Sequence, residues 1–184
     1  MAVTTIPHRI RPGTSADIGV ATDLYIQSFA KEALLDFMFP GRHTDPAPMK
    51  TWVTRRFLLR YWTPGYILTM LDDAKGRPVA FTWWHRPDES LSFRERWLSL
   101  HAWVAPIMRA VLKLHFYLSP IPRVDPHRLG IYDRVFSTIE PDILNSPRRR
   151  SAWYLSSLGV SPDVQGKGFG SLILRDGLEA ADRA

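Results

Sequence analysis

The feature that most constrains the fold is a glycine-rich stretch, SLGVSPDVQGKGFG, at residues 157–170. Its last three glycines, Gly166, Gly168 and Gly170, alternate between an apolar strand-like run and an apolar helix-like run. A residue that precedes proline is driven out of the helical region, so the chain leaves the strand extended at Ser161. Glycine has no Cβ and lets another group touch the main chain. The pattern therefore predicts a close approach to the backbone just where a helix begins.

The start of that helix is expected between Gly168 and Ser171, and its first amides have no acceptor within the helix. A helix N-terminus carries about half a positive charge and binds anions, most often phosphate. Two common phosphate loops do not fit. The P-loop requires Gly-Lys-Ser/Thr, whereas Lys167 is followed by glycine. The dinucleotide fingerprint requires G-x-G-x-x-G, whereas the spacing here is G-x-G-x-G.

A third loop does fit. Residues 165–170 read Q-G-K-G-F-G, a Q-x-x-G-x-G pattern that follows a strand ending V-x-P and precedes the apolar run SLIL. The stretch from Leu158 to Leu174 resembles the acetyl-CoA loop of the GCN5-related N-acetyltransferases. This resemblance implies an α/β fold with a mixed α+β sheet, in one domain over residues 1–184 with a helical insertion at about 88–122. Because LEAADRA carries no helix-stop signal, we expect the fold to continue beyond Ala184.

The resemblance also implies a co-substrate and its contacts. Acetyl-CoA would pair its pantetheine arm with the backbone of Leu158, Gly159 and Val160, near which the acetyl carbonyl would lie. Gly159 within a strand separately indicates a bulge or a close approach by another group. The pyrophosphate would bind the amides of the loop. These loop residues are Gln165, Gly166, Lys167, Gly168, Phe169, Gly170 and Ser171.

The implied reaction is acetyl transfer to an amine, and we expect a small-molecule acceptor. An alkyl amine is protonated at neutral pH, so a base is needed. Glu140, in TIEPD, and His85, at the end of a predicted strand, are the candidate catalytic residues; each has a structural or solvated role as its alternative. A non-catalytic CoA-binding or regulatory module on the same fold is the alternative function.

The rest of the chain alternates between strand-like and helix-like runs. Residues 127–147 follow no clear pattern. Strands are predicted at 8–12, 65–71, 79–85 and 151–160, and helices at 14–30, 48–62 and 170–184.

Residues 91–118 are strongly apolar and predict a helix with a break or kink at Pro106. Arg109 and Lys113 argue against a membrane span and for an amphipathic helix, so no stable membrane insertion is expected. Four roles stay open for this helix: core packing, a lid over a hydrophobic acceptor, contact with a membrane surface, or a homodimer interface. A hydrophobic-ligand or membrane-surface binding protein is therefore a third functional alternative.

Composition excludes several classes of protein. The 184 residues include no cysteine, which excludes disulfides, a thiol nucleophile and cysteine-bound zinc, and fits a reducing compartment. The first residues lack the apolar core of a secretory signal, and we expect a cytoplasmic protein. The net charge of +6 suits an anionic ligand, but the basic residues are dispersed, so nucleic acid is not expected. The histidines lack metal-ligand spacing, and no metal site is predicted.

Overall fold

The computed structural model describes residues 8–143 and 145–183, without the side chains of residues 100, 132, 133, 136 and 140. The chain forms two compact units. The sheet unit comprises the chain through Ala30, Tyr66–His85 and the chain from Tyr154 onward. The helical unit comprises Lys31–Gly65 and Arg86–Trp153, and is wider than the insertion predicted at about 88–122.

The sheet unit contains one four-stranded antiparallel sheet in the order β1-β2-β3-β4. Its strands are β1 (His8–Pro12), β2 (Tyr66–Asp73), β3 (Pro78–His85) and β4 (Tyr154–Val160). The strand β3 is buried along most of its length, because helices cover both faces of the sheet. This arrangement confirms the predicted hairpin and the mixed α/β class.

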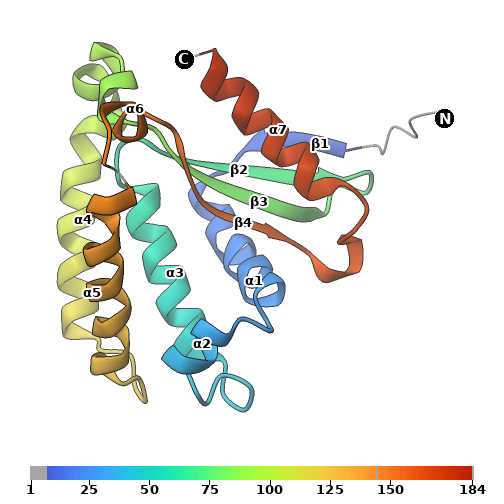
Figure 1. Cartoon of the computed structure of the whole chain (residues 1–184), viewed down its shortest axis with the longest axis vertical. Helices are drawn as coiled ribbons and strands as arrows, with labels where there is room; N and C mark the ends of the chain where they lie inside the picture. The colour runs from blue at the N-terminus through green and yellow to red at the C-terminus, as the bar shows by residue number, and fades with distance from the viewer. Residues whose placement is uncertain (1–7, 144, 184) are drawn as a thin grey trace. The chain divides into compact units, whose positions relative to one another are not determined.

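Two helices cover the sheet (Figure 1). The short turn η1 (Ser15–Asp17) leads into α1 (Ile18–Ser28), which contacts β3 and β4. On the other face, η4 (Pro162–Val164) precedes α7 (Phe169–Asp182), which contacts β2, β3 and β4. The core beneath α7 consists of Leu71, Val79, Ala80, Val164, Phe169 and Ile173.

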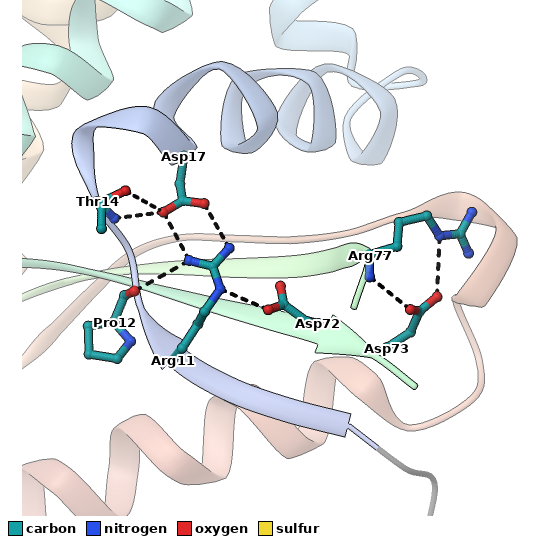
Figure 2. A network of polar contacts seen from close by, with 7 residues as sticks. All are labelled: Arg11, Pro12, Thr14, Asp17, Asp72, Asp73 and Arg77. Carbon is teal, nitrogen blue, oxygen red and sulfur yellow. Dashed lines mark hydrogen bonds and ion pairs between the residues drawn. The ribbon is translucent and has the colours of Figure 1, made fainter. Parts of the chain in front are cut away.

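A polar cluster ties β1 to the start of α1 (Figure 2). The guanidinium of Arg11 donates to Asp17 at 2.8 and 3.0 Å and to Asp72 of β2 at 2.8 Å. The carboxylate of Asp17 also accepts from the amide and hydroxyl of Thr14, each at 2.8 Å, and completes a capping box. The hydrogen bonds from Arg11, and then those from Thr14, lower the pKa of Asp17 to about 2.

The helical unit contains more helix than the sequence predicted. The helix α5 covers most of the segment left without a prediction, because Pro126 starts it and Pro141 lies only two residues from its end. The helices are α2 (Ala33–Met38), α3 (Ala47–Tyr61), α4 (Leu100–Leu118), α5 (Pro126–Ile143) and α6 (Pro147–Arg150), with the short turns η2 (Asp88–Ser90) and η3 (Arg94–Leu98).

The sequence predicted a break or a kink at Pro106, and a break is wrong. The helix α4 runs through Pro106, and the interruption lies at Ser99, whose backbone is extended. The hydroxyl of Ser99 accepts from the amide of Ala102 at 3.1 Å, so this residue ends η3 and caps α4. Among residues 8–143 and 145–183, no helix is long and apolar enough to cross a membrane.

Candidate functional site

A hollow of about 320 Å³ lies at the N-terminus of α7, within the sheet unit. Its wall contains seven of the ten residues that the sequence assigned to the cofactor, and Val164 of η4 besides. The tertiary structure thus brings the end of β4 and the glycine-rich loop to one depression. Its lining residues are Val160, Val164, Gln165, Gly166, Gly168, Phe169, Gly170 and Ser171.

The loop has the backbone geometry that only glycine adopts without strain. Gly166 and Gly168 have φ of +75° and +87°, and a Cβ on either would meet none of the described atoms within 4 Å. The first turn of α7 closes when Leu172 N donates to Gly168 O at 3.0 Å. In the described part of the chain no side chain caps this helix, so the amides of its first turn face the hollow unclaimed by a cap.

Two polar side chains of the loop turn back onto the protein. Gln165 Nε2 donates to Val160 O at 2.9 Å, and Lys167 Nζ donates to Asp163 O at 2.9 Å. The amide of Lys167 also donates to Val164 O at 3.3 Å, so among the seven loop amides this one has an intramolecular acceptor. These bonds hold the loop against β4 and η4 and leave its backbone to form the wall of the hollow.

The open edge of β4 presents backbone groups beside this hollow. Among the described strands β4 pairs with β3 alone. Ser161 N donates to Val79 O at 2.8 Å, and hydrogen-bonded pairs alternate along an antiparallel ladder. The backbone of Gly159 is therefore directed at β3, whereas Leu158 and Val160 direct theirs to the open edge. Of the three residues assigned to pantetheine, the outer two are placed for strand-like pairing.

Gly159 is explained by packing within the protein. A Cβ at this position would lie 2.4 Å from Phe81 Cε1 and 3.1 Å from Ser28 Oγ, so its close approach is to neighbouring side chains. The bulge of β4 lies elsewhere: the pairing skips Ser156, opposite Trp83–Trp84. The prediction of a close approach at Gly159 is thus confirmed, and the approaching groups are side chains of the core between β3 and α1.

Sequence reasoning missed two contacts that position the site. Ser28 Oγ, at the end of α1, donates to Val160 O at 2.8 Å, and nothing in the sequence links these distant positions. Arg77, in the hairpin turn, donates to Asp163 at 3.1 Å and to Asp73 at 3.2 Å. Asp163 also accepts from the hydroxyl of Ser161, and the S-P-D sequence was the available signal for that turn.

Asp163 is an acidic residue next to the expected anion site, but a neighbouring cation balances its charge. The hydrogen bond from Ser161, and the nearby charge of Arg77, lower the pKa of Asp163. The carboxylate is therefore ionised at neutral pH and paired with a guanidinium. Its repulsion of an anion in the hollow is correspondingly reduced.

The two candidate catalytic residues lie in different units. His85, the last residue of β3, pairs with Tyr154, and its ring lies 4.5 Å from the ring of Tyr66. Along β4, Tyr154 and Leu158 are four residues apart, or about 13 Å at the usual rise. Glu140 belongs to α5, in the helical unit, and its side chain lies outside the described residues. In the described ranges no group of three or more His, Asp or Glu residues could hold a metal ion.

Comparison with known proteins bears on the fold. No protein-family model matches the sequence. Among solved structures, the chain is similar to a crystal structure described as histone acetyltransferase HPA2 and related acetyltransferase from Corynebacterium glutamicum. The two share 18% identity at a TM-score of 0.54, over 96% of this chain and 72% of the other. The likeness shows a fold of the GCN5-related N-acetyltransferase type and confirms the fold that the glycine loop indicated.

Proposed function

We propose that the protein is an N-acetyltransferase that transfers the acetyl group of acetyl-CoA to a small-molecule amine. One observation carries the proposal: the hollow at the N-terminus of α7, formed around two left-handed glycines at a helix start without a side-chain cap. Three features of this hollow fit a diphosphate, namely its free amides, the positive end of the helix dipole and the absence of Cβ atoms at Gly166 and Gly168.

Different residues of the sheet unit would bind different parts of acetyl-CoA. Loop amides from Gln165 to Ser171 would donate hydrogen bonds to the pyrophosphate oxygens, with the amide of Lys167 contributing least because it already donates to Val164 O. The outward backbone of Leu158 and Val160 would pair with the pantetheine amides as an added strand does. Val160 O already accepts from Ser28 and Gln165, so its N–H is the more available partner.

Acetyl-CoA would supply an activated thioester. In the transfer, the amine nitrogen bonds to the acetyl carbon, the carbon–sulfur bond breaks, and the proton lost by the nitrogen balances the charge of the departing thiolate. A backbone amide at the open edge of β4 would stabilise the developing oxyanion. Glu140 and His85 are the candidate bases. At about 13 Å along the strand from Leu158, His85 can act directly only on an amine that extends toward Tyr154.

Two measurements on the full chain test this proposal. Acetyl-CoA at about 100 times its Kd should stabilise the fold by about 2.7 kcal/mol and raise the melting temperature. Release of free CoA thiol, followed across a panel of amines, should then show turnover. No stabilisation by acetyl-CoA at any concentration would refute the binding site, and stabilisation without turnover on any amine would favour the non-catalytic CoA-binding module.

A matched pair of variants distinguishes a loss of acetyl-CoA binding at the hollow from a general effect of backbone strain. Gly168→Ala places a Cβ at the hollow with φ of +87°, and Gly76→Ala places one in the β2–β3 turn with φ of +74°. Neither Cβ would meet a described atom within 4 Å, so each should cost a similar 1–2 kcal/mol or so in unliganded stability. Only Gly168→Ala should weaken the acetyl-CoA shift. Equal shifts in both variants would contradict the assignment of the hollow.

A further inference from the structure

The helix α4 is held in one orientation within the helical unit. Near its start, the ring of His101 stacks on Trp62 with centroids 5.3 Å apart and planes 7° apart. One turn on, Ala105 is fully buried. Near its end, the guanidinium of Arg55 in α3 lies 4.8 Å from the ring of Phe116. These contacts repeat at helical spacing, so one face of α4 is packed against its own unit.

The opposite face of α4 is apolar and exposed. Trp103, Ile107, Val111, Leu114 and Leu118 recur at intervals of three and four residues, which places them on one face; we call this set the α4 stripe. Each is more than half exposed, from 54% at Val111 to 70% at Leu118. An amphipathic helix of a globular protein normally buries such a face, so this exposure indicates contact with something else.

The apolar surface continues into the preceding turn. Phe93, Trp97 and Leu98 of η3 and its flank are 57–71% exposed. The segment thus presents two exposed tryptophans, and Tyr117 at the other end of α4 is 83% exposed. Tryptophan and tyrosine favour the boundary between lipid headgroups and acyl chains, because their rings are apolar and their N–H or O–H stays hydrated.

The charge around the α4 stripe has one sign. From Arg96 to Val124 the chain contains four basic residues and no acidic one. Of these, Lys113 lies on α4 beside the stripe and is exposed. Arg109 lies on the packed face, four residues after the buried Ala105, and Arg123 already pairs with Asp45. A second copy of this chain docked on the stripe would bring like charges together, whereas a surface of anionic lipid would be attracted to them. Charge complementarity therefore selects an anionic bilayer over self-association.

We propose that the helical unit adsorbs to anionic membrane surfaces through the α4 stripe, with α4 lying in the interface plane. This mode buries an apolar face in the headgroup region and leaves Lys113, beside the stripe, near the phosphates, without a membrane span. It is independent of the acetyl-CoA hollow, which belongs to the sheet unit.

Co-sedimentation of the full chain with phosphatidylcholine vesicles, with and without phosphatidylserine, tests the proposal. The protein should sediment with the vesicles that contain phosphatidylserine, with at least about tenfold weaker binding to pure phosphatidylcholine, and added salt should release it. The double variant Trp103→Glu/Leu114→Glu should reduce binding by tenfold or more. Leu178→Glu, at a residue 48% exposed in α7, is the matched control and should bind like the unchanged protein.

Circular dichroism of the double variant should be unchanged, since both substituted side chains are exposed. Three results would overturn the proposal: no binding to either vesicle, equal binding to both, or equal loss in the α7 control. A concentration-dependent dimer that the double variant dissolves would assign the stripe to a second copy of the chain instead. The acetyl-CoA melting shift should be the same in all variants, so failure here leaves the proposed transferase activity standing.

Discussion

Replacing Gly177 by alanine tests how α7 is seated on the sheet. Gly177 is buried in α7, and a Cβ built there would lie 2.2 Å from Trp84 Nε1 and 2.4 Å from its Cε2. Real Cβ contacts essentially never fall under 3.0 Å, so the helix or the indole must move by about an ångström. Trp84 is 4% exposed, so its indole is held within the core.

Two opposing effects determine how much Gly177→Ala changes the free energy of unfolding. Overpacking a core costs about 1–3 kcal/mol, and replacing glycine with alanine inside a helix recovers up to about 1 kcal/mol. We therefore expect Gly177→Ala to lower the free energy of unfolding by about 1–2 kcal/mol. Because α7 carries the hollow at its N-terminus, the shifted helix should also weaken acetyl-CoA binding.

Gly19→Ala is the control for this measurement. Gly19 also lies in a helix of the sheet unit, α1, but a Cβ there would meet none of the described atoms within 4 Å. The same substitution should therefore leave stability unchanged or raise it by up to about 1 kcal/mol. Urea unfolding of both variants measures the difference. A Gly177→Ala protein as stable as the Gly19→Ala protein would refute the packing of α7 on Trp84.

Two further predictions concern the polar cluster and α4. The pKa of Asp17 is lowered from 3.8 to about 2, so the stability that its carboxylate contributes is present above pH 4 or so and is lost as pH falls toward 2. Asp17→Asn should therefore lower the free energy of unfolding in urea by about 1–2 kcal/mol at pH 7 and by almost nothing near pH 2. A loss of stability that does not depend on pH would contradict this. Ser99→Ala should remove the cap of α4 and lower stability by about 1 kcal/mol, while Pro106→Ala should raise stability, because α4 continues through that position. Thermal unfolding should give a lower melting temperature for Ser99→Ala than for Pro106→Ala. The opposite order would indicate a helix that is broken at Pro106.

The glycine loop shows which features of the fold can be predicted from the sequence. Alternating glycines, a preceding proline and a following apolar helix are local features, and each restricts the dihedral angles of its own segment. They predicted the start of α7 and the fold type that the structural comparison confirms. The strands of the hairpin were likewise predicted, because β-branched and aromatic runs on either side of a turn are local signals.

Other features depended on contacts between distant residues. The hydrogen bond from Ser28 to Val160 joins residues 132 positions apart, and no local pattern encodes it. Gly159 indicated a bulge or a close approach by another group, and the structure shows that the side chain of Phe81 makes that approach. A break or kink in the apolar segment was assigned to Pro106, but α4 continues through that position next to the buried Ala105, and the cap at Ser99 begins the helix.

The sequence by itself determined where the hairpin turns, which runs of the sheet unit become strand or helix, and where α7 begins, because these follow from dihedral preferences over a few residues. Only the tertiary structure decided which edge of β4 is open, which glycines serve packing, and that the apolar face of α4 points to solvent. Those outcomes depend on which distant side chains fill the same space, and a linear pattern does not specify that.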